Sequence, residues 1–262
     1  MTVGPAATIS GSQDEHALAD MFERDGYAVL PGLLDRWTVQ ALRDDLAAAC
    51  LESGDGADKP PEAVLAEHSC LQFPHLASAR FLDALLAPAL IEVLQTVLGR
   101  ALKLMQSIVL PHRSGAPGMD WHQDRHYLDT GSNRLVAAWV ALDDARPDNG
   151  CLRALPGSHR AAELWPHTAV PDGGYRAHGF PYGEDQSVVL DVDAGTAILF
   201  DGHLLHRSAQ NRRTSGFRRA LIGHFSTDGT PSQWDGDNQL LPLGTGGHIE
   251  IVTGAAPYAH RG

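Results

Sequence analysis

The sequence predicts a mainly β fold, an all-β sandwich or jelly roll with flanking helices, on the strength of two patterns. Apolar side chains follow helical spacing in the first hundred residues, whereas the rest of the chain breaks into short apolar or alternating runs. Glycine, proline, asparagine and aspartate separate these runs, as is typical of sandwiches and jelly rolls. The runs expected to form strands are residues 101–110, 135–142, 151–155, 187–192, 196–200 and 217–225.

The first hundred residues predict helices that support the sheet. Asp14 is placed to cap one helix that ends at Gly26, and Asp35 is placed to cap a second. A third helix is expected over residues 79–98, and Pro88 should split it because proline lacks the N–H that the helix needs. A strand is expected at residues 27–30. The apolar stripes of the first two helices are Leu18, Met21 and Phe22, then Val39, Leu42, Leu46 and Ala49.

A chain of 262 residues fits one large β domain. Residues 53–61, 163–186 and 228–248 are expected to be loops, and loops as long as the latter two are usually functional lids or poorly ordered. The organisation we expect within a single domain (1–262) is a disordered 1–13, a helical support 14–100, a jelly-roll core 101–226 and a C-terminal tail 227–262.

Composition argues against several classes of partner. The net charge of −12 is unsuited to nucleic acid or an anionic membrane. No apolar run approaches the roughly 20 residues of a membrane span, and residues 1–12 lack the pattern of a secretory signal. Three cysteines (Cys50, Cys70 and Cys151) without paired spacing suit a reducing compartment. We therefore expect a cytoplasmic monomer or homodimer with no nucleic-acid or membrane partner.

His122 and Asp124 are the first candidate metal ligands. Side chains two residues apart in an extended strand point to the same face, so an imidazole and a carboxylate would approach one ion from one side. Two histidines and one carboxylate that leave open positions are the ligand set of non-haem Fe(II) oxygenases. A second histidine from later in the chain would complete the set.

Residues 203–219 offer that histidine and an unusual arginine. His203 and His206 are both candidates, and the residues alone do not separate them. Arg218 opens an apolar strand, where a guanidinium is costly to bury without a partner. A dicarboxylate would supply the partner through two parallel charge-assisted hydrogen bonds. Arg219 would point to the opposite face, so only one of the two arginines can face the metal.

Four motifs together resemble the phytanoyl-CoA dioxygenase family over roughly residues 24–226. The motifs are the opening Gly26-Tyr27-Ala28-Val29-Leu30, His122-x-Asp124, the stretch from Asn149-Gly150-Cys151-Leu152 to Leu155-Pro156-Gly157-Ser158-His159, and His206-x-Ser208-x-x-Asn211 followed by Arg218. The resemblance implies a double-stranded β-helix, a cupin-like jelly roll, and an oxygenase that uses Fe(II), 2-oxoglutarate and O2, with ascorbate as a candidate stimulant.

The resemblance also implies roles for single residues. His122, Asp124 and His206 would bind iron, while Arg218 would hold the far carboxylate of 2-oxoglutarate with help from Ser208. The segment between Asn211 and Arg218 is one residue longer than in some relatives, which leaves Arg219 as an alternative. Further co-substrate contacts are expected from Gln106, Gln123 and Trp139, and substrate contacts from Trp121, Arg125 and Tyr127. We expect structural roles for His126, His159 and His224, and a solvated basic patch of Arg207, Arg212 and Arg213.

The activity implied is hydroxylation of an unactivated C–H bond with release of succinate and CO2. Asp124 favours hydroxylation over halogenation, because halogenating relatives lack this carboxylate. The expected substrate is a small or medium organic metabolite; an acyl-CoA would need basic residues such as Arg113, Arg125 and Arg134 for its phosphates. Two alternatives stay open, a jelly-roll metal enzyme of the isomerase type and a non-catalytic binding protein on the same frame.

Overall fold

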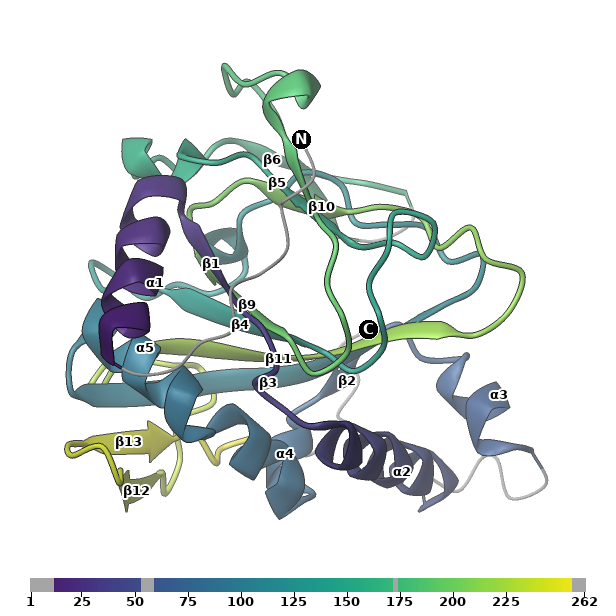
Figure 1. Ribbon diagram of the computed structural model, residues 1–262, viewed down its shortest axis with the longest axis horizontal. Coiled ribbons are helices and arrows are strands. Elements are labelled where there is room, and N and C mark those ends of the chain that lie inside the picture. Colours follow the sequence, from purple (N-terminus) through teal and green to yellow (C-terminus); the bar gives the residue numbers. More distant parts are fainter. Residues whose placement is uncertain (1–11, 53–58, 172–173, 256–262) are drawn as a thin grey trace.

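Two β-sheets face each other, and helices cover the outer face of the larger one (Figure 1). This computed structural model describes residues 12–52, 59–171 and 174–255. The mainly β fold with supporting helices is therefore confirmed, and the pair of facing sheets is the jelly roll that the resemblance implies.

The large sheet runs in the order β1-β9-β4-β11-β3-β13-β12, with the short β2 also paired to β3. The small sheet has the order β10-β5-β8, and isolated bridges from His122 to His206 and from Ala145 to Val192 extend it. The strands are β1 (Tyr27–Leu30), β2 (Leu71–Gln72), β3 (Ala101–Arg113), β4 (Val136–Ala141), β5 (Leu152–Ala154), β6 (His167–Ala169), β7 (Tyr175–Ala177), β8 (Val188–Leu190), β9 (Ala197–Asp201), β10 (His206–Ser208), β11 (Phe217–Thr227), β12 (Gln239–Pro242) and β13 (His248–Ile251).

The helices begin and end largely where local sequence signals predict. Asp35 accepts a hydrogen bond from the backbone N–H of Thr38 at 2.7 Å at the start of the second helix. Pro88 begins a new helix, which confirms the predicted split of 79–98. The helices are α1 (Ser12–Asp25), α2 (Arg36–Glu52), α3 (Pro61–Leu65), α4 (Ala79–Leu85) and α5 (Pro88–Leu98), and the 3-10 turns are η1 (Pro74–Leu76), η2 (Asp124–His126), η3 (Ser158–Ala161) and η4 (Glu184–Gln186).

Strand alternation divides the core into two layers. On β4, Ala138 and Val140 pack against the helices, whereas Ala137 and Trp139 face the small sheet. On β11, the side chains on the inner face are Arg218, Ala220, Ile222 and His224. The interior between the sheets is thus apolar over most of its length and carries an arginine and a histidine near its two ends.

Three features differ from the sequence expectations. The expected loop 163–186 contains the β6–β7 hairpin. The helix α3 begins at Pro61, which is the last residue of the expected loop 53–61. The expected C-terminal tail supplies the strands β12 and β13. β13 pairs in parallel with β3, so the tail extends the large sheet. The first helix starts at Ser12, while residues 1–11 and 53–58, which we expected to be disordered or looped, lie outside the described residues, as does the end of the tail beyond residue 255.

Two further expectations concern the compartment. Within the described ranges, no single helix combines the length and apolarity needed to cross a membrane, although the bent pair α4–α5 meets the length and composition criteria jointly. Cys70 and Cys151 are free thiols, and the side chain of Cys50 lies outside the described residues.

Candidate metal centre

His122 and Asp124 lie where the chain leaves the small sheet. We expected both on one extended strand, but only His122 pairs with a strand residue, through its bridge to His206, and Asp124 already opens the 3-10 turn η2. The strand expectation was therefore wrong. The turn nevertheless brings the carboxylate to the same side as the imidazole, because the ligand atoms of His122, Asp124 and His206 all lie within 4.8 Å of one another. All three residues are buried.

The hydrogen bonds of the two histidines orient them toward a shared ion. His122 Nδ1 donates to the Asp120 carbonyl at 2.7 Å, and His206 Nδ1 donates to the Leu204 carbonyl at 3.1 Å. Both Nε2 atoms then carry a lone pair, and they lie 3.7 and 3.6 Å from Oδ1 of Asp124. Backbone carbonyls that fix the tautomer in this way are the usual support of histidine metal ligands. The arrangement can hold a divalent ion.

Electrostatics keep His122 and Asp124 in the protonation states that a metal requires. Burial, assisted by the neighbouring His206, lowers the pKa of His122 to about 3, so its imidazole is neutral at physiological pH. Burial alone would raise the pKa of Asp124, but His206, His224 and His122 outweigh it and hold that pKa below its ordinary value. A neutral imidazole beside an ionised carboxylate can bind a cation without first losing a proton.

His224 on β11 contacts the candidate centre, a role that we did not assign to it from the sequence. We expected it to be structural, yet its Nε2 lies 3.2 Å from Oδ2 of Asp124. Gln106, an expected co-substrate contact, is the register partner of His224 on β3. A bulge follows this pair, since Phe225 is already opposite Leu104. Alternation from Arg218 along the strand is the sequence signal that would have placed His224 on the inner face.

Arg218 is the cation that faces the interior between the sheets. Arg218 is 1% exposed, and its Nε and Nη1 have no hydrogen-bond partner among the described residues. Burial lowers its pKa to about 10, which still leaves it charged at neutral pH. Arg219 points to the other face and donates from Nε and Nη2 to Asp143 at 2.7 and 2.8 Å, so its charge is already neutralised. Of the two alternatives, Arg218 has the free donors.

Trp139 and Ser208 accompany Arg218. The Cζ atom of Arg218 lies 5.4 Å from the centre of the Trp139 ring, whose Nε1 has no partner within the described part of the chain. Ser208 follows the third candidate ligand on β10 and accepts a hydrogen bond from the Met119 N–H at 2.9 Å. The buried arginine and the unpartnered indole N–H form a polar end to an otherwise apolar interior.

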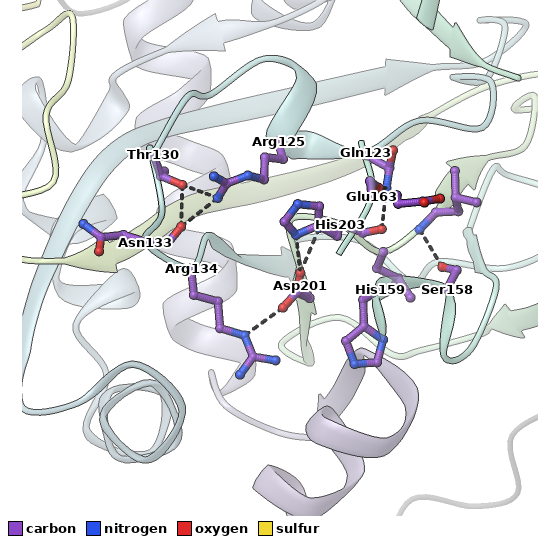
Figure 2. Close-up of polar contacts among 12 residues, drawn as sticks. Gln123, Arg125, Thr130, Asn133, Arg134, Ser158, His159, Glu163, Asp201 and His203 are labelled. Carbon is purple, nitrogen blue, oxygen red and sulfur yellow. Dashed lines mark hydrogen bonds and ion pairs between the residues drawn. The ribbon is translucent and has the colours of Figure 1, made fainter. Parts of the chain in front are cut away.

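Gln123 has a different set of partners from those we expected. Its amide donates to the carbonyls of Glu163 and His203 at 2.8 and 2.7 Å and accepts from the Trp165 N–H at 2.8 Å (Figure 2). The side chain is fully buried in these contacts, which tie the 163–186 segment to the metal centre. His203 pairs with Asp201 through Nδ1 at 3.5 Å, which separates it from the triad and leaves His206 as the third candidate.

Arg125 and Trp121, expected to touch substrate, are engaged within the chain. Arg125 donates to Thr130 and to carbonyls of the turn that follows, including that of Asn133 at 2.7 Å (Figure 2). The Trp121 indole N–H donates to Glu184 at 2.8 Å beneath the 163–186 segment. Both side chains therefore hold loops in place.

Tyr127, the third expected substrate contact, is the one that stays open. It is 39% exposed, and its ring lies edge-on to that of His122, with centroids 6.0 Å apart. Tyr175 of the β6–β7 hairpin meets it at 5.8 Å. Burial, followed by the charge of Asp124, raises the pKa of Tyr127 to about 12, so its phenol is neutral. An aromatic rim thus lies beside the triad.

A double-stranded β-helix that holds two histidines and a carboxylate in this way defines a mononuclear non-haem metal protein. Solved structures share the fold. The non-heme monooxygenase ThoJ is 24% identical with a TM-score of 0.68, covering 83% of this chain and 80% of ThoJ. The epimerase SnoN, solved in complex with Fe3+, alpha-ketoglutarate and nogalamycin RO, is 21% identical with a TM-score of 0.64, covering 82% and 84%.

The family follows from the sequence comparison. The model of the phytanoyl-CoA dioxygenase (PhyH) family matches residues 22–220, and the chain belongs to this family. The mouse peroxisomal phytanoyl-CoA dioxygenase is 27% identical over 79% of this chain and 66% of its own length. The human enzyme of that name is 38% identical over 40% of this chain and 32% of its own length. The matched region thus spans about a third to two thirds of these relatives. The family resemblance expected from the motifs is confirmed.

Proposed function

We propose that the protein is an Fe(II)- and 2-oxoglutarate-dependent dioxygenase that hydroxylates an unactivated C–H bond of a small or medium organic metabolite and releases succinate and CO2. Family membership supports an oxygenase type of enzyme. The proposal includes His122, Asp124 and His206 as iron ligands and Arg218 as the anchor of 2-oxoglutarate.

One observation carries the proposal, the unpartnered guanidinium of Arg218 in the same interior as the triad. A buried cation without a counter-charge is strongly unfavourable, and it is retained in proteins where a ligand completes it. 2-Oxoglutarate presents a carboxylate at each end, so one end fits the guanidinium and the other, with its keto oxygen, fits open positions of a facial triad. A non-catalytic binding protein or a simple metal isomerase would not need this arginine.

The residues of this chain would each serve the reaction by binding or orientation. When bound, iron and 2-oxoglutarate supply the capacity to use O2 for oxidising a C–H bond. His122 and His206 present Nε2, and His122 is already neutral and Asp124 already ionised, so neither of these two has to lose a proton on metal binding. Trp139 and Ser208 would line the co-substrate end of the pocket, and the neutral phenol of Tyr127 would line the substrate side.

The substrate and the fate of the C–H bond belong to the proposal as well. Gln106 remains a proposed co-substrate or substrate contact because it neighbours His224 on β3. Arg125 and Trp121 are removed from the substrate contacts, and so is Gln123 from the co-substrate contacts, because their polar atoms are engaged elsewhere. We keep a small-molecule substrate, a cytoplasmic location, a monomer or homodimer, and no nucleic-acid or membrane partner.

The decisive test is spectroscopic and needs no substrate. Fe(II) and 2-oxoglutarate added anaerobically should give a visible charge-transfer band in the wild type and none in Asp124→Ala. Arg218→Gln should need at least about tenfold more 2-oxoglutarate, because a charge-assisted hydrogen-bond pair is lost. Arg213→Gln, an exposed arginine paired with Asp148, is the matched control and should titrate like the wild type. Absence of the band in the wild type would contradict the proposal.

The outcome of the reaction is tested separately. Candidate metabolites that stimulate succinate release should yield a product that gains one oxygen atom from isotopically labelled O2. A product of unchanged mass would instead favour epimerisation, the reaction type in the name of SnoN. Succinate release without substrate oxidation by any candidate would leave hydroxylation unsupported.

A further inference from the structure

A cleft of about 280 Å³ is lined by residues of the small sheet and its loops, and none of the three candidate metal ligands is among them. His206 and Ser208 of β10 face the interior, so Arg207 between them faces outward and lines this cleft. Arg153 of β5 and Arg212 complete a set of three guanidiniums around it. The remaining lining residues are Pro147, Cys151, Val189, Ala209 and Gln210.

Two of these arginines oppose each other directly. Arg207 and Arg153 are register partners on neighbouring antiparallel strands. Like charges in that position destabilise a sheet. The chain carries 32 acidic residues against 20 lysines and arginines, so a facing pair of arginines with a single carboxylate partner is unexpected on this surface. The guanidiniums of Arg207 and Arg153 therefore repel each other across the two strands, and a bound anion would relieve this repulsion.

The partners of the three guanidiniums leave most of their charge unmatched. Arg153 donates from Nε and Nη2 to the hydroxyl of Ser187 at 3.2 and 2.7 Å, and Arg212 donates only to the Pro147 carbonyl at 3.4 Å. Neither forms an ion pair within the described residues, because nearby Asp148 pairs with Arg213. Arg207 alone has a carboxylate, Glu184, at 3.1 Å.

Arg207 also has a hydrogen-bond donor without a partner among the described residues. Its Nε is buried and has no hydrogen-bond partner in the described part of the chain, while its Cζ lies 5.2 Å from the centre of the Trp121 ring. Stacking on an indole holds a guanidinium in a fixed plane. Three positive charges and one negative charge leave a net excess that matches the charge of a phosphate monoester, about −1.5 to −2.

We propose that this cleft is a binding site for a phosphate group, carried by a small molecule or present as the free ion. Arg153, Arg207 and Arg212 would bind the oxygens through charge-assisted hydrogen bonds. Val189 and Pro147 would lie against an apolar portion of an organic phosphate. Our expectation of a merely solvated basic patch is revised for Arg207 and Arg212 and retained for Arg213.

The lining of the cleft includes neither Arg218 nor a candidate metal ligand. Cys151 lines the cleft, but it also belongs to the apolar layer between the sheets into which Arg218 projects. The inference does not rest on the proposed function, since it uses no residue of the triad and not Arg218. A protein without oxygenase activity would still be expected to bind phosphate here.

Calorimetric titration of the full-length, metal-free protein at low salt tests the site with phenyl phosphate and inorganic phosphate as probes. One equivalent of phosphate should bind, and Arg153→Gln and Arg212→Gln should each weaken binding roughly tenfold because one charged donor is lost. Arg36→Gln removes the same charge at an exposed position on α2 that does not line the cleft, and it should bind like the wild type. Tighter binding of phenyl phosphate would identify an organic phosphate as the ligand, and equal binding would identify the free ion.

Three results would overturn the inference. One is no binding of either probe at millimolar concentration. Another is equal weakening in Arg36→Gln, which would reduce the effect to overall charge. The third is full displacement of the probe by excess 2-oxoglutarate with affinity unchanged in Arg153→Gln, which would place the ion at Arg218. Urea unfolding of each variant provides the check that weakened binding does not reflect lost folding.

Discussion

The Nε2 atom of His224 lies 3.2 Å from Oδ2 of Asp124, while Oδ1 of the same carboxylate faces the Nε2 atoms of His122 and His206. One oxygen of Asp124 is thus held by a hydrogen bond from β11, and the other is directed to the place where an ion would sit. His224 is a positioning residue, since it would touch the metal only through Asp124. Partners of this kind typically change metal affinity by about 10–100-fold when they are removed.

We predict that His224→Ala weakens Fe(II) binding about tenfold or more, because Asp124 loses the bond that fixes its rotamer. His224→Gln keeps a side-chain donor and should recover part of the affinity. Anaerobic competition with a chelator measures both. His178→Ala, a substitution of an exposed histidine, is the control. Equal affinity in His224→Ala and the wild type would show that the triad orients itself without β11.

Substitution of Arg218 should affect co-substrate binding, whereas substitution of the neighbouring Arg219 should affect only stability. Arg219 is paired with Asp143, which Arg43 of α2 also contacts at 2.9 Å, so Arg219→Met should lower the free energy of unfolding by about 1–2 kcal/mol. Arg218→Met removes a buried cation that has unpartnered donors, and it should raise the free energy of unfolding by about 1 kcal/mol.

The measurement is urea unfolding with Zn(II), with and without 2-oxoglutarate. The co-substrate should raise the unfolding midpoint of the wild type and of Arg219→Met by mass action, and leave that of Arg218→Met unchanged. A 2-oxoglutarate response in Arg218→Met together with its loss in Arg219→Met would reverse our assignment of the anchor.

The sequence identifies the parts of the fold that follow from local rules. The cap at Asp35, the break at Pro88 and the alternation of β4 and β11 each depend on neighbouring residues, and the structure has them. The sequence motifs also group His122, Asp124 and His206, and the ligand atoms of these three residues lie close together in the structure. Local rules do not predict long-range pairing. β13 pairs in parallel with β3, and the sequence of β13, which is bordered by glycine-rich turns, does not indicate that partner.

The same limit applies to the roles of polar residues at the centre. Gln123 lies between two candidate ligands, yet its amide bonds to carbonyls 40 and 80 residues away in sequence. No spacing in the sequence indicates those partners. His224, in contrast, follows from the alternation that starts at Arg218, so a register count along β11 would have placed it on the inner face.

Gln123 should hold the 163–186 segment, and we predict that Gln123→Met lowers the free energy of unfolding by about 3 kcal/mol. The apolar replacement leaves the carbonyls of Glu163 and His203 and the Trp165 N–H without the partner that Gln123 supplies. Limited proteolysis should also cut faster between residues 163 and 186. Gln233→Met is the control at an exposed position. Wild-type cleavage rates in Gln123→Met would mean that the hairpin is held by its other contacts.

Acid should destabilise the protein through His112, the register partner of Arg218 on β3. Burial, followed by the charge of Arg218, lowers the pKa of His112 to about 3, whereas the unfolded chain titrates near 6.5. Between these values the unfolded state binds more protons than the folded state, so the free energy of unfolding falls as pH falls. The stability is fully present above about pH 6.5 and is lost progressively toward pH 3.

His112→Gln removes this protonation difference. Between pH 7 and pH 5 the wild type should therefore lose about 2 kcal/mol more stability than the variant, which corresponds to about 1.4 kcal/mol per pH unit once the unfolded histidine is protonated. Urea unfolding at four pH values across this interval measures the difference. His178→Gln replaces an exposed histidine and should follow the wild-type curve. Parallel curves for the wild type and His112→Gln would mean that this imidazole is protonated equally in the folded and unfolded chains, and that the field of Arg218 does not reach it.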